Sequence, residues 1–323
     1  MMRGFKAQQQ HFTDMGTRDD RANLVDDDPF SRPQKARIHR IHQRQANDGT
    51  IHFDTNSGNI GGMLNQLLSG FQQKPAAMHD GRIWHFSKTE KSHLAFAMGA
   101  FTLALGLFQV GGIFSISRVG LIPWIGDLLL AMPVMLLAIG PAFLLHEIGH
   151  KIVAKKNGCW AEFRADPKGL RNGVLVAAIL GIVLMAPGAV MVAGLVTRRQ
   201  NGHIAVAGPL VNLSLFIIGV PLWGAVIGLT GSTEFAHYSY LTTDNSLIWQ
   251  AMVFDIGYYW LGANLFLGLF NMIPWGPLDG LKVKDWNEQA FYIVIAIFAI
   301  PVAGILMGYW GPTALLQSIA GYF

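Results

Sequence analysis

From His93 onward the chain alternates long apolar runs with short polar segments. The runs cover residues 93–115, 126–149, 173–195, 205–229, 248–274 and 290–310. Each approaches the ~20 residues that an α-helix needs to cross a bilayer. Residues 1–92 have few periodic apolar positions and are rich in Gln, Asn, Asp, Gly and Arg, which predicts a largely disordered polar tail. We therefore expect a tail over 1–92 and an all-α polytopic membrane domain over 93–323.

Composition supports this division and excludes one class of partner. The chain is 51% hydrophobic and 14% charged, whereas soluble domains carry roughly 25% charged residues. More than half of the charged residues lie in the first 92 positions, where acidic and basic residues are interleaved. The pI of about 9.2 therefore does not indicate nucleic-acid binding, since no basic stripe with alternating aromatic residues accompanies it. Cys159 is the single cysteine, so no internal disulfide can form.

Six apolar runs do not require six crossings, and the charges of the loops distinguish the alternatives. Most basic residues after position 92 lie within 151–204, whereas 230–247 has none. Because short basic loops stay cytoplasmic, six crossings would put Arg198 and Arg199 on the wrong side of the membrane. We therefore favour five crossings, a cytoplasmic N-terminus, and a re-entrant or β-hairpin segment over 173–195. Within that segment, Pro187 and Gly188 offer a turn.

The sequence His146-Glu147-Ile148-Gly149-His150 ends the second apolar run and indicates a metal site. Positions i and i+4 share one helix face, so both imidazoles can bind one ion, while Glu147 can act as a general base. A catalytic zinc needs a third protein ligand. The later glutamates are expected in loops: Glu162, Glu234 and Glu288. Asp279 follows the run 248–274, which is parallel to the second run in the five-crossing topology, so we expect Asp279 to meet the two histidines.

Three motifs in order resemble the site-2 protease family of intramembrane zinc metalloproteases. They are His146-Glu-Ile-Gly-His150, Gly208-Pro-Leu-Val-Asn212 and Pro277-Leu-Asp-Gly280. The resemblance covers roughly 93–290. It implies one Zn²⁺ per chain held by His146, His150 and Asp279, and a general-base role for Glu147.

The same resemblance implies contacts with the substrate. It predicts that Asn212 touches the substrate backbone, and Asn271, in the segment of Asp279, is a further candidate. In the family, the region between the first two motifs is a membrane-associated sheet or hairpin that meets the substrate, and residues 160–204 fit that place. The partners expected from the resemblance are a transmembrane protein substrate and the lipid bilayer, with the oligomeric state left open.

Two further acidic residues lie in apolar runs and receive structural interpretations. Asp255 lies 24 residues before Asp279, or about 36 Å along a continuous helix. It therefore cannot reach the same metal, and we interpret it as a helix-pairing or interfacial residue. Asp127 is expected to cap the helix that follows it.

The leading hypothesis is an intramembrane zinc endopeptidase in a prokaryotic plasma membrane. A zinc protease of the prenyl-protein-processing type would need a Glu ligand in a later helix, and the sequence predicts no such residue. A helical transporter could use intramembrane Asp and His as an ion relay, although no inverted repeat supports it. A catalytically inactive relative that only binds its partner is a further alternative, against which the intact Glu147 argues.

Overall fold

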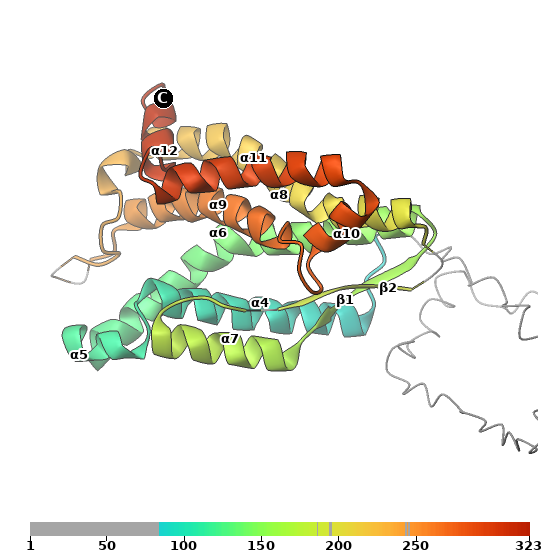
Figure 1. The fold of residues 1–323 in the computed structure, drawn as a ribbon. Helices are drawn as coiled ribbons and strands as arrows, with labels where there is room; N and C mark the ends of the chain where they lie inside the picture. Colours follow the sequence, from blue (N-terminus) through green and yellow to red (C-terminus); the bar gives the residue numbers. More distant parts are fainter. Residues whose placement is uncertain (1–83, 186, 194–195, 243, 245) are drawn as a thin grey trace, which may run out of the picture. The chain divides into compact units, whose positions relative to one another are not determined.

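The structure is a computed structural model that describes residues 84–185, 187–193, 196–242, 244 and 246–323. The prediction of a disordered tail falls mainly on residues outside these ranges. The elements in chain order are α4 (Lys88–Gln109), η1 (Ile113–Ser115), α5 (Ile116–Val119), α6 (Leu121–Lys156), β1 (Trp160–Ala165), α7 (Pro167–Leu180), β2 (Gly188–Ala193), α8 (Arg198–Leu229), η2 (Ser232–Phe235), α9 (Trp249–Asn271), α10 (Asp279–Trp286), α11 (Glu288–Leu306) and α12 (Pro312–Ala320) (Figure 1).

Five of the helical segments in the described residues are long and apolar enough to cross a membrane. They are Lys88–Val119, Leu121–Lys156, Arg198–Leu229, Trp249–Asn271 and Glu288–Leu306. Many large apolar side chains on these segments are exposed, as expected for surfaces that face lipid. The protein is thus an all-α polytopic membrane protein, as the apolar runs predicted.

The run 173–195 does not form a continuous spanning helix. Helix α7 ends at Leu180 and is capped by Gly181, whose φ of 62° is left-handed. Strand β2 follows and pairs antiparallel with β1, in a register from Trp160 opposite Ala193 to Ala165 opposite Gly188. The run therefore holds a helix and a strand rather than one spanning helix, as the five-crossing prediction requires, and its strand pairs with a segment outside the run. The helix ends well before the turn predicted at Pro187 and Gly188, and re-entry of the segment into the membrane stays a prediction.

Helix α6 lies at the centre of the bundle and packs against α4, α8 and α9. It begins after Gly120, which has a φ of 87°. The expectation that Asp127 caps a helix is wrong: Asp127 is the seventh residue of α6, because the apolar residues from Leu121 onward already belong to the helix. Two of the glutamates that we expected in loops lie in regular structure: Glu162 is in strand β1, and Glu288 is the first residue of α11.

Helices α6 and α8 approach each other closely because each presents a glycine at the contact. A Cβ atom on Gly149 of α6 would lie 3.2 Å from the Ala207 carbonyl oxygen of α8. A Cβ atom on Gly208 of α8 would lie 2.5 Å from the Nε2 atoms of both His146 and His150. Small residues of this kind let membrane helices pack backbone to backbone, and here they bring α8 directly onto the metal-motif face of α6.

Asp255 lies deep in the bundle, in α9. Its side chain is 3% exposed and accepts a hydrogen bond of 2.8 Å from the Tyr240 hydroxyl. The amide of Gln109, the last residue of α4, lies 3.5 Å away. These contacts join α9 to α4, so the interpretation of Asp255 as a helix-pairing residue is confirmed.

Candidate metal centre

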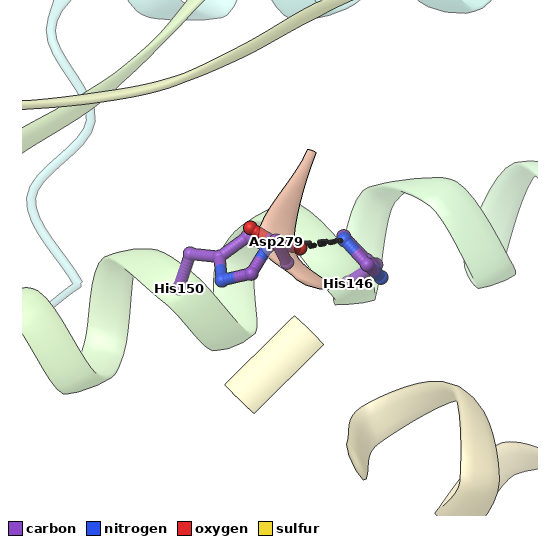
Figure 2. A group of neighbouring side chains, drawn as sticks. All are labelled: His146, His150 and Asp279. Atoms are coloured by element: carbon purple, nitrogen blue, oxygen red, sulfur yellow. Dashed lines mark hydrogen bonds and ion pairs between the residues drawn. The ribbon is translucent and has the colours of Figure 1, made fainter. Parts of the chain in front are cut away.

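The structure brings His146, His150 and Asp279 together at a buried point between α6 and α10 (Figure 2). Asp279 Oδ2 lies 3.4 Å from His146 Nε2 and 3.0 Å from His150 Nε2. The two Nε2 atoms are 3.0 Å apart. Asp279 thus meets the two histidines although it lies at least 129 residues after them in the chain. The parallel arrangement of the second and fifth apolar runs predicted this contact.

The donor set fits a zinc ion. Each imidazole has its Nδ1 beside a hydrogen-bond acceptor: the Asn212 Oδ1 for His146 and the Ile204 carbonyl oxygen for His150, at 2.6 and 2.7 Å. With its proton on Nδ1, each ring directs the Nε2 lone pair toward the cluster. Ligand atoms about 2 Å from a tetrahedral zinc lie about 3.3 Å from one another. The separations of 3.0 to 3.4 Å match that geometry.

Asp279 reaches the histidines because the chain reverses after α9. Helix α9 ends at Asn271, and α10 starts at Asp279 itself. The reversal is tight: a Cβ atom on Gly280 would lie 2.1 Å from the Met272 carbonyl oxygen, which restricts this position to glycine. Burial acts to raise the pKa of Asp279, but the His150 and His146 side chains outweigh it and hold that pKa well below its ordinary value. The turn after α9 therefore holds Asp279 at the histidines, and a carboxylate oxygen is a ligand that zinc accepts.

Glu147 lies beside the cluster on the same helix. Its side chain is buried, and its Oε2 accepts a hydrogen bond of 3.1 Å from the backbone N–H of Val190 in β2. The candidate general base is therefore in direct contact with the strand that follows α7. This contact puts one edge of the β1–β2 sheet at the candidate metal centre.

Asn212 orients a candidate ligand. Its side chain is fully buried: Oδ1 accepts from His146 Nδ1, and Nδ2 donates to the Ala142 carbonyl and to Asn264 Oδ1, both at 3.0 Å. Asn264 in turn donates to the Trp260 carbonyl oxygen at 2.8 Å. Sequence reasoning missed Asn264, although a buried Asn within an apolar run is a signal that could have found it. The predicted contact of Asn212 with substrate stays a prediction.

Asn271 is placed differently from Asn212. Its amide donates to the Leu267 carbonyl oxygen of its own helix at 3.0 Å, and the side chain is half-buried. This bond joins it to its own helix and not to the histidines, so its substrate-binding role stays a prediction.

The contrast between the two asparagines gives a matched test. We expect Asn212→Ala to lower zinc affinity by about 10- to 100-fold, because His146 loses the partner that fixes its tautomer and ring orientation. Asn271→Ala should leave zinc affinity unchanged. Competition titration of each purified variant against a chromogenic zinc chelator measures the effect, and equal affinities in the two variants would contradict the orienting role.

The fold and the site define a polytopic helical membrane protein with a candidate His2Asp metal centre. Over 206 residues the chain is 33% identical to a protein of Methanocaldococcus jannaschii named "Putative zinc metalloprotease", and the match covers 64% of this chain and 91% of that relative. The chain therefore belongs to the same family as this Methanocaldococcus jannaschii protein. No protein-family profile matches the chain, and no solved structure matches it.

Proposed function

We propose that this protein is an intramembrane zinc endopeptidase of the site-2 protease type, which hydrolyses peptide bonds in or near transmembrane segments of other membrane proteins. The observation that carries the proposal is the buried convergence of His146, His150 and Asp279 next to Glu147, within a bundle that has five membrane-length helices. The similarity to a protein named as a zinc metalloprotease supports the same reaction class.

The residues divide the chemistry among them. His146, His150 and Asp279 would hold the ion, and Nδ1 contacts on both imidazoles keep the rings in place. A bound zinc would supply Lewis acidity, activating a water molecule and polarising the peptide carbonyl. The Glu147 carboxylate would accept a proton from the attacking water and pass it to the departing amine. All four side chains are buried, so the water consumed in the reaction must reach them through the protein.

The β1–β2 sheet is the element proposed to hold the substrate. A peptide inside a membrane helix has its carbonyls shielded by its own hydrogen bonds, so it must unwind before hydrolysis. An extended peptide can pair with an exposed strand edge. The edge of β2 that carries the Val190 N–H lies at Glu147, so a peptide paired there would have its peptide bonds beside the general base and the candidate metal ligands.

The proposed orientation follows the charged loops. Lys155 and Lys156 end α6, and Lys282 and Lys284 lie in α10, beside Asp279. Under the positive-inside rule these segments face the cytoplasm, and so does the N-terminus. We propose a prokaryotic plasma membrane as the location, with water reaching the site from the cytoplasmic face.

Removal and return of zinc tests the proposal. The full-length protein is reconstituted in lipid vesicles with a single-span membrane protein, and products are followed by gel and mass spectrometry. We expect cleavage by the protein holding one zinc per chain, loss of cleavage after treatment with a zinc chelator, and recovery on adding zinc. A protein that binds no zinc would contradict the metal site. One that binds zinc but cleaves none of a panel of single-span proteins would favour a transporter or a catalytically inactive relative.

A further inference from the structure

Each outer edge of the β1–β2 sheet donates a backbone hydrogen bond to a carboxylate. The two donors belong to one pair of facing residues, one in each strand. Phe163 of β1 pairs with Val190 of β2. The N–H of Phe163 donates to Glu90 Oε1 and that of Val190 to Glu147 Oε2, both at 3.1 Å. The two N–H groups therefore point away from each other. One edge is attached to the candidate general base, and the other to an acidic residue with no role in the proposed chemistry.

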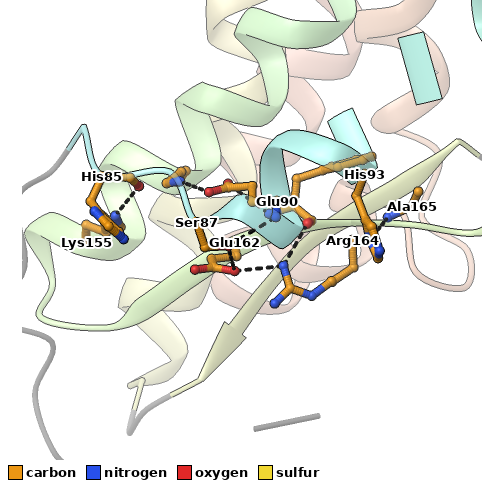
Figure 3. Close-up of polar contacts among 10 residues, drawn as sticks. His85, Ser87, Glu90, His93, Lys155, Glu162, Arg164 and Ala165 are labelled. Carbon is orange, nitrogen blue, oxygen red and sulfur yellow. Dashed lines mark hydrogen bonds and ion pairs between the residues drawn. The ribbon is translucent and has the colours of Figure 1, made fainter. Parts of the chain in front are cut away.

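The edge of β1 is occupied by side chains of α4 (Figure 3). Glu90 takes the N–H of Phe163, and His93 Nδ1 takes the N–H of Ala165 at 3.2 Å. Because residues three apart share a helix face, α4 bonds to β1 at two successive outward-pointing N–H groups. At the N-cap of α4, the Ser87 hydroxyl also donates to the carboxylate of Glu162 at 2.9 Å. Helix α4 thus covers the β1 edge and leaves the β2 edge toward the metal centre.

Glu90 also binds the metal-motif helix. Its Oε2 accepts from the ammonium of Lys151, the residue after His150, and both side chains are nearly fully buried. The Lys151 Nζ lies 3.7 Å from the centre of the Phe86 ring. Desolvating two charges offsets much of their attraction, so a buried ion pair is weak evidence for stability. Its geometry, which ties α4, α6 and β1 together through a single carboxylate, indicates a role in placement.

We propose that Glu90 and Lys151 are positioning residues that hold the β1–β2 sheet at a fixed place over the metal-motif helix and so determine which peptide bond is cleaved. The inference rests on the proposed function. A substrate strand that pairs with β2 takes over the Val190 N–H, which releases Glu147 from the sheet. Glu90 keeps its bonds to Phe163 and Lys151 during that exchange. The sheet therefore stays attached to α6 one helical turn away from Glu147.

The predicted consequence concerns the position of the cut. A strand that shifts along its partner moves in steps that keep side chains on their face, so the preferred shift is two residues. A sheet that loses its attachment at Glu90 should present the substrate in several such registers. Loss of the pair should therefore spread cleavage over neighbouring bonds and lower kcat, while the zinc ligands, which lie on α6 and α10, keep their metal.

The test uses Glu90→Leu, Glu90→Gln and the double variant Glu90→Gln, Lys151→Met, all in the zinc-loaded full-length protein in lipid vesicles. Glu90→Gln keeps an oxygen for the Phe163 N–H and is the conservative variant. The double variant removes both charges and leaves no buried ion unpaired. It therefore keeps the test possible if Glu90→Leu fails to fold. Asp285→Asn, which breaks the exposed ion pair with Arg198, is the matched control.

Four quantities are measured: zinc per chain, kcat and KM, the cleaved bonds by mass spectrometry, and hydrogen exchange of residues 160–165 and 188–193. We expect one dominant bond for the wild type and the control. For Glu90→Leu and the double variant we expect several bonds, a kcat at least about tenfold lower, faster exchange of both strands, and one zinc. Glu90→Gln should restore most of the dominant cleavage.

Two results would overturn the inference: an unchanged cleavage position and exchange rate in these variants, or loss of zinc together with activity, which indicates a general role in folding. Failure of the proposed function is recognised separately. If the zinc-loaded wild type cleaves nothing, the endopeptidase proposal fails, and with it the role in choosing the bond, while hydrogen exchange still reports whether Glu90 and Lys151 hold the sheet.

Discussion

Glu147→Gln is expected to abolish peptide cleavage while the protein still binds one zinc per chain. Glutamine has nearly the same shape as glutamate but cannot accept a proton at neutral pH. General acid–base groups contribute roughly 10²- to 10⁴-fold to rate, so we expect a loss of about 10³-fold or more. The amide oxygen of glutamine can still accept the Val190 N–H, as Glu147 Oε2 does now, so the β1–β2 sheet should stay in place.

The measurement pairs cleavage of a single-span membrane protein with zinc quantified by atomic emission on the same sample. Glu234→Gln is the control, because Glu234 lies in η2, away from the metal motif. A Glu147→Gln protein that cleaves at the wild-type rate would rule out the general-base role. Loss of zinc in this variant would instead show that Glu147 is needed to hold the metal centre together. In that case the residue that transfers the proton would have to be sought elsewhere.

Gly208→Ala is expected to disrupt the metal centre through a single methyl group. The added Cβ would lie 2.5 Å from the Nε2 atoms of both His146 and His150, a separation that forces either the imidazoles or α8 to move. The rings cannot rotate away freely, because the Asn212 side chain and the Ile204 carbonyl hold their Nδ1 atoms. We expect weaker zinc binding and, since a displacement of about 1 Å can cost roughly 100-fold in rate, a comparable loss of cleavage.

Gly262→Ala is the matched control for this substitution. Gly262 also lies within a membrane-length helix, α9, and a Cβ atom there would meet nothing within 4 Å. It therefore carries the same change in helix propensity without the close contact. Zinc content, cleavage and size-exclusion profile are compared across the wild type and both variants. Full zinc binding by Gly208→Ala would show that α8 and the histidines are further apart in the working protein.

The sequence alone was sufficient for the local part of the candidate site and for the all-α membrane fold. His146 and His150 are four residues apart, and helix geometry by itself puts them on one face. Loop charge favoured five crossings, and the same arrangement brought Asp279 to the histidines, which the structure bears out in the distances among the three side chains. These features depend on periodicity, charge and chain direction, each of which can be read from consecutive residues.

Contacts between distant segments depended on the tertiary structure. Asn212 and Asn264 are 52 residues apart and Glu90 and Lys151 are 61 apart, and no spacing rule connects such pairs. Asp127 and Glu162 were given the wrong local structure for a related reason, since helix starts and short strands depend on what packs against them. Sequence periodicity thus determined which residues can face a metal within one helix. Only the packing of α4, α8 and the β1–β2 sheet onto α6 decided which side chains orient those residues, because such contacts arise from the approach of whole elements.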